Sequence, residues 1–341
     1  LAQEGVSYVL LHRRHTWEVE RVEARLESML GTPVVRDETA TLYRVEPTPP
    51  PEQVVAMLDG QDWGWVEPWA GEPGRWLEGR ANLVIYTPCE MAGALRFYAL
   101  SGDKPRHLAV QINDEDARSM VIGQHLHYTL PDVTLQAGYN VVRFDVLEAC
   151  WPVQGDAHCS VNWPLIGLPP EDACWLAAPF DRCLDVLFQS FSFTPTDELA
   201  DYRSIGTQVG DSFRLIGYSL EKALFWPDMV LTLTLSWQAL DAPPEDYNFF
   251  VHVLNAETGE LAAQYDGAPL HEAFRTSQWQ PGDIVQEQVN LYLPPDLAAG
   301  DYALVAGMYH LPGLERLTVQ GGRPYAQDNL VWLQDVVIEV P

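Results

Sequence analysis

The sequence predicts a mainly β protein, with two β-sandwich (jelly-roll-like) domains preceded by a small α/β unit. Apolar and polar residues alternate strictly along residues 231–238, which is the period of a strand with one buried face. Alternation returns along residues 249–254 after a Pro-containing connection, so we expect the two segments to be neighbouring antiparallel strands. Past residue 60, short runs of this kind are separated by turn sequences such as SGDKP and NDED, a pattern typical of a sandwich.

Residues 1–46 predict a small β-α-β-β unit. An apolar strand over residues 5–11 precedes a helix over residues 18–30, whose apolar stripe consists of Val19, Val22, Leu26, Met29 and Leu30. Thr16 is placed to cap the start of this helix and Gly31 to end it. A hairpin over residues 33–36 and 39–45 completes the unit. A unit this small has little core of its own, so we expect it to dock on something or to end a larger domain.

The proline-rich stretch EPTPPP predicts a stiff linker over residues 47–60. The first sandwich is expected over residues 61–195, with strands at 81–87, 93–100, 108–112, 124–130, 140–147 and 184–193. The second is expected over residues 203–341, with strands at 213–221, 229–239, 248–254, 262–265, 284–293, 301–309 and 330–340. Helix is nearly absent from the sequence pattern after residue 60.

Four cysteines lie close together around a long loop between two predicted strands: Cys150, Cys159, Cys174 and Cys183. No CxxC pair occurs, so the spacing favours disulfides over a zinc site and indicates an oxidising compartment. We favour a nested arrangement in which Cys150–Cys183 clamps the base of the loop and Cys159–Cys174 lies inside it. Closing loops of this size contributes about 3–4 kcal/mol in the chain-entropy model. Local pairing, Cys150–Cys159 with Cys174–Cys183, is the alternative, because sequence alone does not decide connectivity.

The composition argues against two classes of partner. A formal net charge of −28 repels nucleic acid and anionic lipid, so neither is expected to bind. No apolar run approaches the roughly 18–20 residues that cross a bilayer, so no transmembrane segment is expected in this chain. No signal peptide is recognisable and the first residue is Leu1 rather than Met, so we expect a fragment or a processed product.

Motifs for catalysis, cofactors and metals are weak or missing. Neither GxGxxG nor a P-loop occurs, and the nearest approach to a nucleophile elbow, around Ser219, lacks its second glycine and lies in a strand pattern. His125 and His127 share one face of a predicted strand, where solvated histidines are commoner than metal ligands. Residues 113–116 (NDED) are better explained as a charged hairpin tip than as a Ca²⁺ site. We therefore expect no catalytic residues, no metal and no cofactor.

The aromatic residues give the candidate ligand site. Four tryptophans lie in or beside a Gly- and Pro-broken stretch: Trp63, Trp65, Trp69 and Trp76. Exposed flat rings stack on flat ligands such as sugar faces, so these four are the predicted ligand-binding residues. The alternative is that they pack under loops and close the ends of the sandwich.

Several segments resemble a known family. GVSYVLLH, a helix and LGTPVVRDETATLYRVEP resemble the end of bacterial membrane glycosyltransferases of the dolichyl-phosphate-mannose-protein mannosyltransferase type. RWLEGRANLVIYTP, LRFYALSGDKPRHLAVQIND, LQAGYNVVRFDVLEAC and DRCLDVLFQSFSF resemble a jelly-roll module of their C-terminal tails. RLIGYSLE, LTLTLSWQAL, NFFVHVLNAETGELAAQYDG and YLPPDLAAGDYALVAGMY resemble a further β-sandwich appended to them.

The resemblance covers nearly the whole chain and implies an extracytoplasmic region that follows the last membrane helix. The family's catalytic acidic residue lies in an early loop that has no counterpart here, so the resemblance implies no catalytic residue in this chain. The expected function is a non-catalytic accessory region that holds glycan or acceptor. The alternatives are a cell-surface structural protein whose tandem sandwiches bind other copies of the chain, and a carbohydrate-binding module in its own right.

Overall fold

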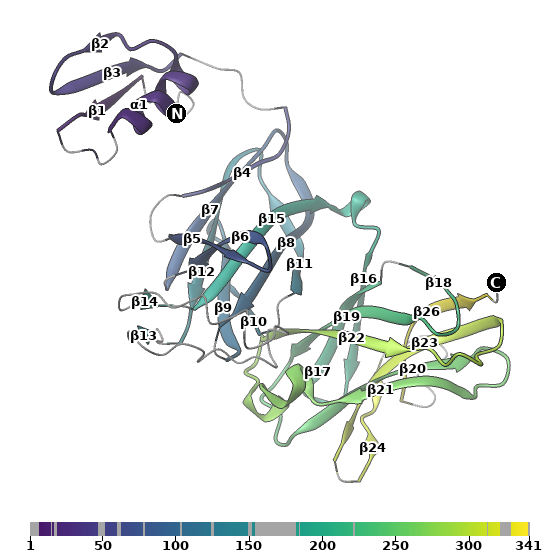
Figure 1. Ribbon diagram of the computed structural model, residues 1–341. Coiled ribbons are helices and arrows are strands. Elements are labelled where there is room, and N and C mark those ends of the chain that lie inside the picture. Colours follow the sequence, from purple (N-terminus) through teal and green to yellow (C-terminus); the bar gives the residue numbers. More distant parts are fainter. Residues whose placement is uncertain are drawn as a thin grey trace. The chain divides into compact units, whose positions relative to one another are not determined.

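The computed structural model describes residues 7–339, apart from 15, 17–18, 47–51, 60–62, 78, 103, 124–125, 149–151, 154–181, 184, 221, 312 and 321–328. The protein is mainly β, as predicted, with 61% of its residues in strands and one α-helix in the described part (Figure 1). Residue contacts divide it into two compact units, Leu1–Gln53 and Val54–Pro341.

The first unit is a three-stranded antiparallel sheet with a helix against it. Its elements are β1 (Tyr8–His12), α1 (Val19–Leu30), β2 (Val35–Arg36) and β3 (Ala40–Arg44), and the strand order is β1-β3-β2. This is the β-α-β-β order that the sequence predicts. Alternation along β3 buries Thr41 and Tyr43, which face the helix side of the sheet.

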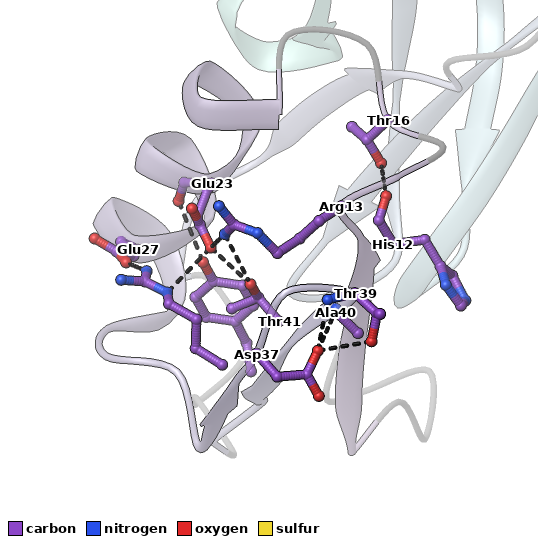
Figure 2. A network of polar contacts seen from close by, with 11 residues as sticks. His12, Arg13, Thr16, Glu23, Glu27, Asp37, Thr39, Ala40 and Thr41 are labelled. Atoms are coloured by element: carbon purple, nitrogen blue, oxygen red, sulfur yellow. Dashed lines mark hydrogen bonds and ion pairs between the residues drawn. The ribbon is translucent and has the colours of Figure 1, made fainter.

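A polar network ties the helix to the sheet in this unit (Figure 2). The carboxylate of Glu23, a buried residue of α1, accepts hydrogen bonds from Thr41 Oγ1 at 2.6 Å and from Arg13 Nη1 at 2.5 Å. Arg36 Nε lies 3.1 Å from the same carboxylate oxygen. The Thr41 hydroxyl, followed by the Arg13 guanidinium, lowers the pKa of Glu23. The network therefore holds Glu23 as an anion where α1 meets β3.

The first sandwich fills residues 54–195. Its strands are β4 (Val55–Leu58), β5 (Trp63–Trp69), β6 (Glu72–Leu77), β7 (Arg80–Thr87), β8 (Met91–Ser101), β9 (Arg106–Ile112), β10 (Arg118–Ile122), β11 (Leu126–Leu135), β12 (Gly138–Val146) and β15 (Val186–Pro195). One sheet has the order β11-β8-β15-β6-β5 and the other β10-β9-β12-β7-β4. Their inner faces form one apolar core around Phe97, Phe144 and Phe188. β4 lies inside the stretch predicted as linker and pairs with β7.

The long loop between β12 and β15 is described at its two ends. There β13 (Pro152–Val153) pairs with β14 (Arg182–Cys183), and Pro152 lies opposite Cys183. The loop therefore leaves and re-enters the sandwich side by side. Cys150, Cys159, Cys174 and the side chain of Cys183 lie outside the described residues, so both disulfide arrangements stay predictions.

The second sandwich follows the short 3₁₀ helix η2 (Thr196–Glu198). Its strands are β16 (Tyr202–Val209), β17 (Phe213–Leu220), β18 (Leu224–Phe225), β19 (Val230–Ala239), β20 (Tyr247–Asn255), β21 (Leu261–Gly267), β22 (Ile284–Tyr292), β23 (Gly300–His310), β24 (Glu315–Arg316), β25 (Val319–Gln320) and β26 (Val331–Ile338). Two further 3₁₀ turns, η3 (Pro269–Glu272) and η4 (Thr276–Gln278), lie between β21 and β22. The sheets are β25-β16-β17-β19-β22 and β18-β26-β23-β20-β21, with β24 beside β23.

The alternating segment at residues 231–238 forms most of β19, and its apolar members are at most 1% exposed in the core between the two sheets. The prediction that β19 and β20 are neighbours is wrong. β19 pairs with β17 and β22, whereas β20 pairs with β21 and β23. Both strands face the same core from opposite sides, because the connection at residues 240–246 crosses from one sheet to the other. Alternation specifies a buried face and leaves the pairing partner undetermined.

The two sandwiches share one sheet. β10 of the first pairs in parallel with β22 of the second, with Met120 opposite Ile284 and Val121 opposite Val285. The result is a ten-stranded sheet that runs through both sandwiches (Figure 1), and residues 54–341 therefore form one compact unit. The sequence predicts the two sandwiches and does not predict this shared sheet.

Candidate functional site

A polar cleft of about 650 Å³ lies where the two sandwiches meet. One wall is the outer face of β8, β11 and β15, and the other is the outer face of β17, β19 and β22. The lining residues are Arg96, Phe97, Tyr98, Leu126, His127, Ser190, Ser192, Asp201, Ser219, Thr232, Leu233, Thr234 and Gln288. The volume falls within the range of roughly 300–1,000 Å³ that small-molecule sites occupy.

The first wall follows from strand alternation. Along β8, Leu95, Phe97 and Ala99 enter the core, so Arg96 and Tyr98 project from the opposite face. Strand pairing then sets two rows across the wall: Ser190, Tyr98 and His127 in one, and Ser192, Arg96 and Thr129 in the next. Each row crosses three strands of one sheet. The first row holds a hydroxyl and two rings at fixed spacing, and the second holds two hydroxyls and a cation.

The second wall has the same origin. Leu231, Leu233 and Leu235 of β19 enter the second core, so Thr232 and Thr234 face outward. Thr234 lies opposite Ser219 of β17 on one side and Gln288 of β22 on the other. The polar half of the alternation is visible in the sequence. That it faces the first sandwich depends on the β10–β22 pairing, which no local pattern signals.

Arg96 and Asp201 form an ion pair in the cleft. Arg96 Nη2 lies 2.5 Å from Asp201 Oδ2, and Nη1 lies 3.2 Å from Oδ1, so the contact is bidentate. Arg96 Nε also donates to Thr129 Oγ1 at 3.3 Å. The side chains of Arg96 and Asp201 are 22% and 34% exposed, so both still reach the cleft. Bidentate pairing fixes the plane of both groups and balances their charges.

Two rings lie together on the first wall. The centroids of Tyr98 and His127 are 4.3 Å apart, with 36° between the ring planes. Burial raises the pKa of the Tyr98 phenol, so its hydroxyl stays protonated at neutral pH and is able to donate a hydrogen bond. The ring pair gives the cleft an apolar surface beside its hydroxyl groups.

Several hydroxyls in the cleft are not used by the fold. Within the described part of the chain, the side chains of Ser190, Ser192, Ser219 and Thr234 make no hydrogen bond to another protein group. Thr232, by contrast, donates to Asn290 Oδ1 at 2.8 Å. The four hydroxyls come from both walls, and each supplies one donor and two acceptor positions to whatever occupies the cleft.

The predicted tryptophan site lies elsewhere, and three of its four rings are buried. Trp63, Trp69 and Trp76 are 8%, 4% and 0% exposed. Trp63 packs edge-on against Phe144, and its Nε1 donates to the carbonyl of Asn82 at 2.8 Å. These three rings present no face to a ligand: Trp63 belongs to the core of the first sandwich, and Trp69 and Trp76 are buried as well. The side chain of Trp65 lies outside the described residues.

The other candidates from the sequence have structural explanations. Ser219 lies within β17, not at a strand-to-helix turn, so no nucleophile elbow forms. A Cβ atom on Gly217 would lie 2.3 Å from Tyr202 Oη, which explains the glycine as a packing requirement. The side chain of Asn113 bonds Asn140 and the backbone of Val141, and so holds its own hairpin tip. His127 lines the cleft, and His125 lies outside the described residues.

The described residues contain no group of three or more His, Cys, Asp or Glu side chains placed to hold a metal ion. None of the helices found among them is long and apolar enough to cross a membrane.

No protein-family model matches the chain, and no curated protein matches its sequence. Among solved structures, the C-terminal domain of wzt is 16% identical over 41% of this chain and 81% of that domain, with a TM-score of 0.26. The Podospora anserina GH26-CBM35 β-(1,4)-mannanase is 12% identical over 48% of this chain and 32% of the mannanase, with a TM-score of 0.27. A putative β-galactosidase from Bacteroides fragilis is 10% identical over 92% of this chain and 41% of that protein, with a TM-score of 0.20.

This chain therefore spans less than half of the length of those two enzymes. The neighbours are distant and include sugar-related proteins with β-sandwich domains. A similarity at this level indicates no shared activity.

Proposed function

We propose that this protein binds carbohydrate without transforming it, and that the cleft between the two sandwiches is the binding site. One observation carries the proposal: the cleft brings four unengaged hydroxyls from both walls together with the Tyr98–His127 ring pair. A sugar ring presents hydroxyls around its edge and C–H groups on its faces. Hydroxyl-lined walls match the edge, and an aromatic surface matches the faces.

The charges in the cleft favour binding over hydrolysis. Glycoside hydrolysis generally uses two carboxyl groups, one on each side of the scissile bond. Of the described residues that line the cleft, Asp201 alone carries a carboxylate, and Arg96 holds it in a bidentate pair. One carboxylate engaged in this way does not supply the pair of carboxyl groups that such hydrolysis uses.

The resemblance noted in the sequence suggests the larger protein in which this site would act. We place the chain in the extracytoplasmic accessory region of a membrane glycosyltransferase of the dolichyl-phosphate-mannose-protein mannosyltransferase type. There the cleft would hold the glycan or acceptor beside a catalytic part supplied elsewhere. The four predicted disulfide cysteines support an oxidising, extracytoplasmic location.

The test is binding to a glycan array, followed by calorimetry on the strongest ligand with matched tyrosine variants. Tyr98→Ala removes half of the ring pair, whereas Tyr139→Ala removes a comparable ring that packs against Tyr86 away from the cleft. We expect Tyr98→Ala to weaken binding at least about tenfold, as loss of an aromatic contact of roughly 1.5 kcal/mol requires, and Tyr139→Ala to leave it unchanged. Mass spectrometry should recover the oligosaccharide intact. Equal effects of the two variants, or release of a product, would contradict the proposal.

A further inference from the structure

We propose that the Arg96–Asp201 pair restricts the cleft to neutral, hydroxyl-rich glycans. The inference rests on the proposed function and names the class of ligand within it. The charged or titratable groups among the described lining residues are Arg96, Asp201 and the ring of His127, in a chain whose formal net charge is −28.

The geometry leaves part of each charged group available. A guanidinium carries five N–H donors, and Arg96 uses three of them, two toward Asp201 and one toward Thr129. Each oxygen of Asp201 accepts one of those bonds and keeps a second acceptor position. Both side chains remain partly exposed. The pair therefore offers donors and acceptors side by side, which suits neighbouring hydroxyls on one sugar ring, since a hydroxyl both donates and accepts.

The same geometry discriminates against charged sugars. A uronate or sulfate would compete with Asp201 for Arg96, and would leave the Asp201 carboxylate without its partner. An amino sugar would compete with Arg96 in the same way. Leaving one member of a partly buried ion pair uncompensated costs more than a typical hydrogen bond returns. The acidic surface adds a general repulsion of anionic glycans. A neutral glycan meets neither penalty.

Hydrogen bonds from the second sandwich also support the Arg96–Asp201 pair, through Thr129. Thr129, which accepts the bond from Arg96 Nε, has its backbone N–H bonded to Gln286 Oε1 at 2.9 Å and its carbonyl bonded to Gln286 Nε2 at 2.6 Å. Gln286 lies on β22 and is 1% exposed. The position of Arg96 is therefore fixed relative to both walls before any ligand binds, which lowers the cost of ordering on binding.

The experiment compares three proteins on an array of neutral, uronate-containing, sulfated and amine-bearing oligosaccharides. They are the wild-type chain, Asp201→Asn, and Asp145→Asn as a control. Asp145 is paired with Arg80 on the β7–β12 pair, outside the cleft, so its replacement removes a similar partly exposed ion pair. Calorimetry on the strongest ligand at low and high NaCl, and thermal unfolding to confirm that each variant is folded, complete the design.

We expect the wild-type chain to bind neutral glycans, with an affinity that changes less than about twofold between low and high salt. Asp201→Asn should weaken that binding at least about tenfold, because it removes an ionised acceptor. It should also gain binding to uronate-containing glycans, because Arg96 is then unpaired. Asp145→Asn should behave as wild type.

Two results would overturn the inference while leaving the proposed function intact. One is a strongest ligand that is charged and whose binding depends on Tyr98. The other is an Asp201→Asn protein with wild-type selectivity. Failure to find any glycan whose binding depends on Tyr98 would instead overturn the proposed function and this inference with it.

Discussion

The Nε2 atom of His107 lies 3.0 Å from Oδ2 of Asp283, across the line where the two sandwiches meet. His107 is the second residue of β9 in the first sandwich, and Asp283 immediately precedes β22 of the second. The other ring nitrogen, Nδ1, contacts the carboxylate of Glu148. Oδ1 of Asp283 accepts a hydrogen bond from Ser119 at 2.7 Å. One imidazole is thus held between two carboxylates, next to the parallel β10–β22 pairing.

This cluster predicts how stability changes with pH. Hydrogen bonds with Asp283 and then Glu148 raise the pKa of His107 from 6.5 to about 9. The folded protein therefore binds the proton more tightly than the unfolded chain. The contribution of His107 to stability is fully present below pH 6.5 and is lost as pH rises through about 9. A shift of that size corresponds to about 3 kcal/mol.

The two carboxylates contribute in the opposite direction. Burial acts to raise the pKa of Asp283 and of Glu148, but hydrogen bonds from His107 and nearby donors outweigh it, so both pKa values are lowered. Their contributions are present above the usual carboxyl range and are lost as pH falls through their lowered pKa values. The cluster should therefore stabilise the folded protein most between the usual carboxyl pKa range and about pH 6.5.

The check is urea unfolding of wild type and His107→Gln from pH 4 to pH 10. We expect the difference in unfolding free energy to be largest near pH 6 and to shrink as pH passes about 9. His252→Gln is the contrasting control. Burial lowers the pKa of His252, so its effect should instead diminish as pH falls below 6.5. A difference for His107→Gln that does not change with pH would show that the cluster does not hold the proton as described.

Gln286 makes a second connection between the sandwiches, and its loss should be costly. Its side-chain amide bonds the backbone N–H and carbonyl of Thr129 and also donates to Ser236 Oγ at 2.9 Å. Gln286→Leu would leave these buried groups unpaired, and we expect a loss of about 2–4 kcal/mol. Gln264→Leu, at an exposed position of β21, should change stability by less than about 0.5 kcal/mol. Chemical denaturation measures the stability of both variants. Equal losses would show that the hydrogen bonds of Gln286 across the two sandwiches do not stabilise the fold.

The pair of Arg106 and Asp185 gives a third prediction at the base of the long loop. The two side chains are 0% and 1% exposed, with Nη1 and Oδ1 3.3 Å apart. Asp185→Leu alone removes an anionic partner from a buried guanidinium, and should cost about 3–5 kcal/mol. The double variant Arg106→Met/Asp185→Leu removes both charges and should recover most of that loss. A double variant as unstable as the single one would show that the pair contributes more than mutual neutralisation.

These contacts mark where sequence reasoning succeeds and where it stops. Alternation identifies the buried faces of β8 and β19, because side-chain direction depends only on position along a strand. It leaves the neighbouring strand undetermined, so β19 and β20 are wrongly paired and the β10–β22 contact is not anticipated. The cleft depends on that contact. The sequence therefore predicts that Arg96 and Thr234 face outward. It does not predict that they lie on facing walls of one cleft.

The tryptophans illustrate a different limit. Trp63 and Trp76 lie among Gly and Pro residues, a context typical of exposed loops, and yet they form part of β5 and β6. Trp63 Nε1 donates a hydrogen bond to the carbonyl of Asn82, and Trp76 Nε1 donates one to Glu67 Oε2; both contacts are partly buried. Burial of a tryptophan depends on such partners from distant segments. The sequence shows the rings and not the acceptors.

The last prediction concerns Gly217, the glycine two residues before Ser219 in β17. Packing explains it: a Cβ atom there would lie 2.3 Å from Tyr202 Oη and 2.7 Å from the carbonyl of Arg203, beside the irregularity where β16 meets β17. Gly217→Ala should therefore destabilise the protein by about 1–3 kcal/mol, because backbone and ring must both move. Gly313→Ala is the matched control, since a Cβ there meets its nearest neighbour, Glu315 Cγ, at an ordinary 3.7 Å. Thermal and urea unfolding measure the two variants. A Gly217→Ala protein as stable as the control would mean that the ring of Tyr202 yields without cost, and the glycine would then need another explanation.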